Sequence, residues 1–228
     1  MGIAARLLTY STLDNNRNPT GGAFVQVKQD IAGLGGDLDF VRSGVDARYY
    51  HGLYGDLVAV GRVQAGNVMG YGGQAVPLFQ KFFGGPWLVR GFAPNGFGPR
   101  DLSPGTAQDN VGGSTFVGAS AELQSPIPGI PKDAGLKAAV FVDAGNVWNY
   151  QGPTTFAPPI FPNTLCGQGG NPKNCGGPAD STNVRASVGA GLIWDSPFGP
   201  LRVDYAVPIA KQSYDVTQPF RFSAGPGF

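Results

Sequence analysis

Few residues of this chain could take part in covalent or metal chemistry. The single histidine, His51, lies in the apparent turn "YYHGLYG", and one histidine supports neither a Ser-His triad nor a histidine-ligated metal site. The glycine-rich stretch "GGQAVPLFQKFFGG" lacks the Lys-Ser/Thr ending of a phosphate-binding loop. The sequence therefore predicts a protein that is not an enzyme, with no catalytic residue, metal or cofactor.

Two cysteines, Cys166 and Cys175, lie close together in "CGQGGNPKNC", outside the predicted strands. An oxidising compartment would favour a disulfide that closes a small loop between them. A zinc site is the weaker alternative because no histidine is near. The pair is a disulfide candidate.

One arginine is notable for its neighbours. Arg90 lies between Val89 and the pair Gly91-Phe92 in "GGPWLVRGFAPNGFGPRD", inside a segment too long for an ordinary turn. A guanidinium is always charged, and its planar set of donors suits carboxylates, so Arg90 could anchor a long loop if acidic groups lay within reach. The alternative is a solvated surface loop with Arg90 exposed.

Composition limits the partners and the fold. The chain has 228 residues, a net charge of +1 and 16 basic residues that are scattered singly, which does not favour nucleic acid as a partner. No apolar run approaches the roughly 18 to 20 residues of a membrane-spanning helix, and "MGIAARLLTY" lacks the features of a signal peptide. We expect one all-β domain, either mature or a piece cut from a longer chain.

Alternation with a period of two predicts the elements that must position Arg90. In "NVRASVGAGLIW" one face is fully apolar, while the other carries Arg, Ser and Gly. The same pattern recurs along the chain and predicts nine strands, at 3–11, 23–31, 41–50, 57–66, 114–123, 136–148, 183–194, 199–208 and 220–228.

The two strand faces indicate a membrane barrel. The apolar face is built from small Ala, Val and Leu side chains, aromatic residues gather near strand ends, and the polar face is charged. Tight turns alternate with long segments at 71–112 and 149–182, as in an outer-membrane β-barrel. A soluble sandwich with its charged face outward is the alternative. Nine strands do not close a bacterial barrel, which needs an even number, so we expect either the C-terminal part of a larger barrel or a miscounted strand.

Several motifs together resemble the C-terminal barrel part of the BamA family of outer-membrane protein assembly factors, within the BamA/TamA superfamily and its bacterial surface antigen domain. They are "FFGGPWLVRGF", "VGGSTFVGASAELQSP", "FVDAGNVW" and "VGAGLIWDSPFGPLRVDYAVPI", followed by a last strand that ends in Phe; the resemblance runs from about Ala4 to Phe228. It implies residence in the bacterial outer membrane as the C-terminal part of a 16-stranded antiparallel barrel. Segment 71–112 would be a lid that folds into the lumen, and 149–182 a second extracellular loop.

The resemblance also implies acidic partners for Arg90 on the inner wall. Glu122 in "SAEL" and Asp143 in "FVDAG" both fall on the polar face of adjacent predicted strands, and are the expected partners. Gly91 would allow the loop backbone to approach the wall closely, and Phe92 would pack beside it.

The last predicted strand, "FRFSAGPGF", suggests a weak seam. Phe220, Phe222 and Phe228 lie on its outward face and resemble the C-terminal signal of outer-membrane barrels. Gly225 matches a kink position of the family, whereas Pro226 departs from the regular ending and cannot donate to a ladder. The alternative is a frayed terminus.

The function expected from the resemblance is the assembly and insertion of β-barrel proteins into the outer membrane. The partners would be the lipid bilayer, client outer-membrane proteins and, through periplasmic repeats absent from this sequence, accessory lipoproteins. The alternatives are a two-partner-secretion type pore of the same superfamily, a free-standing small barrel or porin, and, least favoured, an outer-membrane enzyme.

Overall fold

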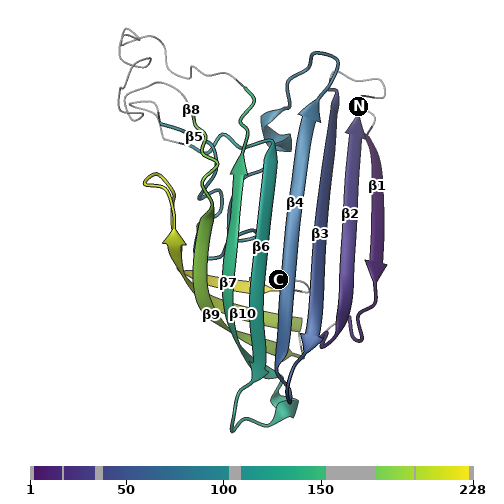
Figure 1. Ribbon diagram of the computed structural model, residues 1–228, viewed down its shortest axis with the longest axis vertical. Coiled ribbons are helices and arrows are strands. Elements are labelled where there is room, and N and C mark those ends of the chain that lie inside the picture. Colours follow the sequence, from purple (N-terminus) through teal and green to yellow (C-terminus); the bar gives the residue numbers. More distant parts are fainter. Residues whose placement is uncertain are drawn as a thin grey trace.

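A single antiparallel sheet dominates the computed structural model, which describes residues 3–16, 18–33, 38–102, 109–152, 178–197 and 199–225. The sheet has nine strands in the order β1-β2-β3-β4-β6-β7-β9-β10-β11 (Figure 1). These correspond to the nine predicted strands, so the predicted all-β, partial-barrel fold class is confirmed. Their bounds are β1 Ile3–Ser11, β2 Gly22–Ala32, β3 Phe40–Gly52, β4 Val58–Gly70, β6 Thr115–Pro126, β7 Leu136–Trp148, β9 Arg185–Ser196, β10 Gly199–Ala210 and β11 Phe220–Ala224.

The sheet is strongly curved. Strands β10 and β11 cross behind the long strands in Figure 1, so the sheet has a concave inner side and a convex outer side. Strands β1 and β11 form the two edges of the strand order. In the described part of the chain these two edges are not paired with each other.

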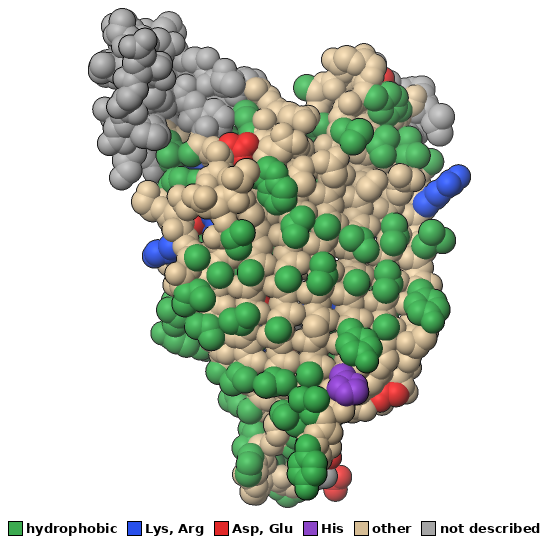
Figure 2. Space-filling view, in the orientation of Figure 1, with side chains coloured by type: hydrophobic (Ala, Val, Ile, Leu, Met, Phe, Trp, Pro, Cys, Tyr) green, Lys and Arg blue, Asp and Glu red, His purple; other side chains and the backbone are tan. Residues whose placement is uncertain are grey.

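Alternation along the strands places apolar side chains on the outer side. On β10, Tyr205 and Val207 are exposed, whereas Arg202, Asp204 and Ala206, which lie on the opposite face of the strand, are buried. Apolar side chains spread over the outer face (Figure 2). A soluble sandwich would have the opposite arrangement, while an apolar outer band is what a lipid-facing barrel wall requires.

The connections differ in length at the two ends of the strands. The turns 53–57 and 197–198 are short, as the tight "DSPFGP" turn was predicted to be, whereas β4 and β6 are joined through 71–114 and β7 and β9 through 149–184. The two long connections contact each other through a small sheet, in which β5 (Arg100–Asp101) pairs with β8 (Pro178–Ala179). Cys166 and Cys175 lie outside the described residues.

The apolar core lies on the concave side, between the first long connection and the wall. It combines wall residues with residues of the connection, namely Ala32, Phe40, Val68, Val76, Phe82, Leu88, Val89, Phe92, Phe97, Phe116 and Val147. The first long connection is therefore packed against the sheet and is not a solvated surface loop.

Helical structure in the described ranges is limited to two short 3₁₀ turns, η1 (Leu78–Gln80) and η2 (Lys132–Ala134). No described helix is long and apolar enough to span a membrane. The turn predicted in "YYHGLYG" lies at 53–57, but His51 itself is not part of it, because β3 continues through His51 to Gly52 and pairs with β4 there.

Candidate functional site

The site is built by the lid loop, which we define as residues 84–97 of the first long connection. Its two ends are tied by hydrogen bonds between Gly84 and Phe97, with N–O distances of 3.1 and 3.4 Å. Inside the loop, the amides of Leu88 and Val89 both donate to the carbonyl of Gly85 at 3.0 Å. This turn buries Leu88 and Val89 and directs Arg90 toward the wall.

Arg90 contacts the two carboxylates expected from the sequence. Its Nε and Nη2 donate to the two oxygens of Asp143 at 2.6 and 2.7 Å, and its Nη1 donates to Oε2 of Glu122 at 2.6 Å. The backbone amide of Arg90 also donates to Asp143, at 3.0 Å. Loop backbone and side chain are thus both fixed to one carboxylate, and the Arg90 side chain retains 13% exposure.

The register of β6 and β7 explains why these groups meet. Ser120 pairs directly with Asp143, and Glu122 with Phe141, so the four side chains form a compact patch on the inner wall. Ser120 accepts a hydrogen bond from Arg90 at 3.0 Å and donates one to Asp143 at 2.6 Å. The Arg90 guanidinium carbon lies 3.4 Å from the centroid of the Phe141 ring.

A second arginine completes the charge network from β10. Arg202 donates to both oxygens of Glu122, at 2.9 and 2.7 Å, and its Nε donates to Asp204 at 2.9 Å. Glu122 therefore links the lid to β10 as well as to β6. Alternation along "GPLRVDYAVP" puts Arg202 on the polar face of its strand, but this pattern does not indicate that Arg202 shares a partner with Arg90.

The network stabilises the charge of Arg90 in its covered position. Burial alone would lower the pKa of Arg90, but the hydrogen bond and charge of Asp143, together with the charge of Glu122, raise its pKa above the usual value. Paired charges with several hydrogen bonds are the arrangement that tolerates burial. The described residues contain no group of three or more His, Cys, Asp or Glu suited to a metal ion.

Glycines at the contact allow the lid to approach the wall. A Cβ at Gly118 would lie 2.2 Å from Cδ1 of Leu88, and one at Gly145 would lie 3.1 Å from its Cγ, so Leu88 fills a notch between two paired glycines. Gly91 has φ of +90°, and a Cβ there would lie 3.1 Å from the carbonyl oxygen of Ala206. A side chain at Gly91 would be strained and crowded.

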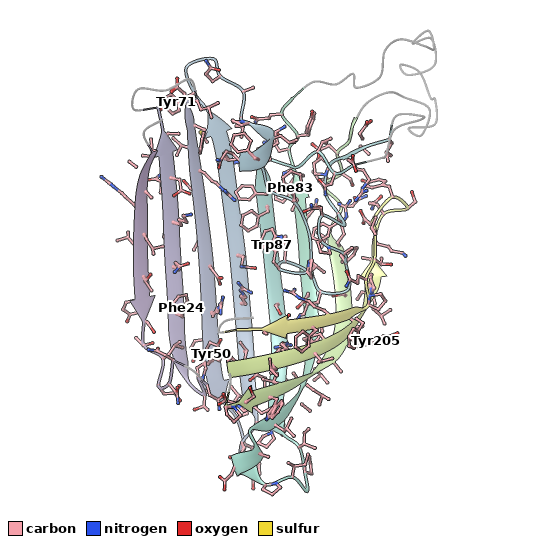
Figure 3. The ribbon with its side chains drawn as sticks, turned by 180° about the vertical axis from the view of Figure 1, so that it is seen from behind. Phe24, Tyr50, Tyr71, Phe83, Trp87 and Tyr205 are labelled. Atoms are coloured by element: carbon pink, nitrogen blue, oxygen red, sulfur yellow. The ribbon has the colours of Figure 1, made fainter. Side chains whose placement is uncertain are left out.

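Aromatic contacts hold the rest of the lid. Phe92 is buried and packs edge-on against Phe97, with ring centroids 5.0 Å apart. Trp87 packs edge-on against Phe116 of β6 at 5.0 Å and donates from its Nε1 to the Phe83 carbonyl at 2.8 Å. Figure 3 shows Trp87 and Phe83 on the concave side, whereas Tyr205 points away from it.

A cavity of about 230 Å³ remains beside the lid. Its lining includes Arg48, Arg62 and Arg221 on the wall, with Trp87 and Arg90 from the lid. The lumen is polar where the lid does not cover it.

The last strand, β11, is short and lies at the edge of the sheet. It pairs with β10 from Phe220 to Ala224, and Phe220 and Phe222 are exposed on the outer side. Gly225 has φ of +119°, and its amide donates to the Pro200 carbonyl at 3.0 Å. Phe228 and Pro226 lie outside the described residues.

These features define a class: an outer-membrane β-barrel chain with an internal arginine-bound loop. The Omp85 superfamily domain matches residues 7–228, and the chain belongs to the Omp85 superfamily. The resemblance to the C-terminal barrel part of the BamA family is confirmed, as is the location in the bacterial outer membrane.

The relatives are assembly factors. The chain is 33% identical to outer membrane protein assembly factor BamA of Neorickettsia risticii over 94% of its length, and 30% identical to that of Neisseria meningitidis over 92%; each match covers 26% of the relative. The chain also matches the crystal structure of BamA from Haemophilus ducreyi lacking POTRA domains 1–3, with a TM-score of 0.79 and 28% identity. The match covers 96% of the present chain and 41% of the BamA chain in that structure. The chain thus spans about a quarter of these curated relatives.

Proposed function

We propose that this chain serves, as part of a β-barrel assembly factor, to fold and insert barrel proteins into the bacterial outer membrane. The observation that carries the proposal is the 33% identity to an outer membrane protein assembly factor over 94% of the chain. The work requires no nucleotide and no catalytic residue. Its partners are the bilayer, client outer-membrane proteins and accessory lipoproteins that bind periplasmic repeats outside this sequence.

The lid supports a role in the lumen. In this proposal segment 71–112, which includes the lid loop, is the lumen lid, and 149–182 is a second long extracellular loop. Arg90, flanked by Val89, Gly91 and Phe92, holds the lid against Glu122 and Asp143. The lumen therefore keeps one shape while a client strand pairs with the edge of the sheet. The bidentate contact to Asp143 supplies the geometric specificity for this.

The seam is the second working part of the proposal. Strand β11 has five residues, fewer than its neighbour β10 with twelve, and is followed by the positive-φ Gly225. A short edge strand leaves backbone donors and acceptors of β10 open to another strand, which is the physics of β-augmentation. Phe220 and Phe222 would hold this seam in the lipid, and Phe228 would extend it.

Reconstitution tests this function and separates it from the alternatives. The intact protein is placed in liposomes, an unfolded client barrel is added outside, and client folding is followed by heat-modifiable gel migration. We expect folding at least tenfold faster than with empty liposomes. Transfer of unfolded client to the liposome interior would favour the secretion pore instead, and ion conductance without any effect on the client would favour a porin.

A further inference from the structure

A further buried arginine lies outside the lid network. Arg185, at the start of β9, is fully buried. Its Nε and Nη2 donate to the two oxygens of Asp215 at 3.0 and 3.2 Å, and its Nη1 donates to Oδ1 of Asn146 at 2.7 Å and to the Asn183 carbonyl at 2.9 Å. One guanidinium thus joins β7, the approach to β9 and the loop that carries Asp215.

That loop, residues 211–219, connects β10 to β11, and we call it the latch loop. The Asp215 side chain has no exposed surface, and it also accepts a hydrogen bond from the Gln212 amide at 2.7 Å. Tyr214 places its hydroxyl 3.3 Å from Arg185. The latch loop is therefore fixed by a buried ion pair at its middle.

The latch loop hydrogen-bonds to the lid through backbone groups. Val216 donates to the Gly96 carbonyl at 2.8 Å and accepts from the Ala93 amide at 3.0 Å. The Gln218 amide donates to the Gly91 carbonyl at 2.9 Å, and an antiparallel bridge between Phe92 and Thr217 lies between the Gly91 and Ala93 contacts. The lid backbone at Gly91, Ala93 and Gly96 is thus hydrogen-bonded to the latch loop.

We infer that Arg185 is a positioning residue for the lid: through Asp215 it fixes the latch loop, and the latch loop holds lid residues 91–96. The inference rests on the proposed function only in assuming that the position of the lid matters for client insertion. The contacts between Arg185, the latch loop and the lid do not depend on that function. Since the latch loop leads directly into β11, the position of the lid is coupled to the edge strand of the sheet. A client that displaces β11 would loosen the lid, and an undocked lid would loosen β11.

Energetics favour this assignment over ordinary packing. A buried charge that loses its partner is strongly unfavourable, because water cannot replace the lost contact. The acceptors for the Arg185 guanidinium come from three separate segments: β7, the residues before β9 and the latch loop. If the latch loop moves away, the guanidinium loses the acceptors on Asp215. Moving the latch loop away from Arg185 therefore costs a large amount of free energy.

Hydrogen–deuterium exchange of the intact protein in lipid nanodiscs tests the inference. Asp215→Asn keeps the shape of the side chain but removes the charge. We expect amide exchange to rise at least tenfold both in 211–219 and in the lid at 91–97, with β7 unchanged. Asp133→Asn, in the exposed turn η2 at the other end of the strands, is the matched control and should change neither. Faster exchange in 211–219 alone, or in neither segment, would overturn the inference.

A second variant separates the latch contact from the ion pair. Val216→Pro removes the amide that donates to Gly96 but leaves the charges of Arg185 and Asp215 unchanged. We expect the lid to exchange faster here too, and a lid as protected as in the wild type would contradict the coupling. Because no client is present, these results stand apart from the reconstitution: altered exchange with unchanged client folding would uphold the coupling and count against the proposed function of the lid.

Discussion

The inner wall carries two similar charge clusters with different surroundings. Under the lid, Arg90 and Asp143 approach to 2.6 Å, and the Asp143 side chain is 2% exposed. On β3 and β4, Arg62 and Asp46 also approach to 2.6 Å, and Arg48 shares the same carboxylate, but Asp46 is 20% exposed. The first cluster joins a loop to the wall, whereas the second joins neighbouring strands that the ladder already holds.

The difference shows that ion-pair geometry alone does not make a site on this wall. A pair open to the lumen is solvated and screened, and such pairs contribute about 0 to 1 kcal/mol. Removing one partner of a covered ion pair costs much more, about 3 to 5 kcal/mol, because the other charge stays buried without a partner. What distinguishes the Arg90 cluster is the lid that covers it, so variants that uncover it should act most strongly.

Removing the lid arginine should have the largest effect. Arg90→Ala leaves Asp143 and part of Glu122 without their partner, and we expect lid docking to weaken by about 3 kcal/mol, the low end for a covered pair because the lumen is wet. Limited proteolysis should then cut within 84–97 while the strands stay resistant. Arg6→Ala, on the exposed strand β1, is the control. A lid as resistant as in the wild type would refute the anchor.

Filling the notch under the lid should have the next largest effect. Gly118→Val places carbon atoms where Leu88 now lies, and overpacking of this kind costs about 1 to 3 kcal/mol. Gly61→Val, on the outer side of β4 where a Cβ meets nothing within 4 Å, is the matched control. Faster lid proteolysis in Gly118→Val but not in Gly61→Val is the expected result, and equal behaviour of the two would mean that the notch does not hold the lid.

The open cluster should matter less. Asp46→Asn removes the carboxylate shared by Arg48 and Arg62, yet we expect a loss in unfolding free energy of no more than about 1 kcal/mol, because the groups remain partly solvated. Lid proteolysis should be unchanged. A loss as large as that of Arg90→Ala would show that covering by the lid is not the reason why the two clusters differ in energetic importance.

The smallest effect should come from a solvated turn. The side-chain hydrogen bond from Thr20 lowers the pKa of Asp14 to about 2, in the exposed turn between β1 and β2. A carboxyl group whose pKa is lower in the folded state than in the unfolded state stabilises the fold at pH values above its unfolded-state pKa. This stabilisation is lost as the pH falls through the folded-state pKa, here between about pH 4 and pH 2. Asp14→Asn should thus shift the melting temperature slightly at pH 5 and not at pH 2, as measured by circular dichroism.

The sequence predicted the strands well because alternation is a local property. Period-two patterns located all nine strands and placed Glu122 and Asp143 on the inner face, and the family motif indicated Arg90. Arg202 could not be assigned to the same network, because its contact with Glu122 depends on how far the sheet curves between β6 and β10. The pairing of Arg185 with Asp215 could not be predicted, because it depends on the paths of two loops, which have no periodic pattern.

The need for a docked lid in client insertion is tested by the rate at which an unfolded client barrel folds into liposomes that contain the intact protein. Wild type, Arg90→Ala and Arg6→Ala are compared at equal protein density. We expect Arg90→Ala to be at least tenfold slower and Arg6→Ala to match the wild type. Equal rates for all three, with the Arg90→Ala lid cleaved readily by protease, would contradict that need.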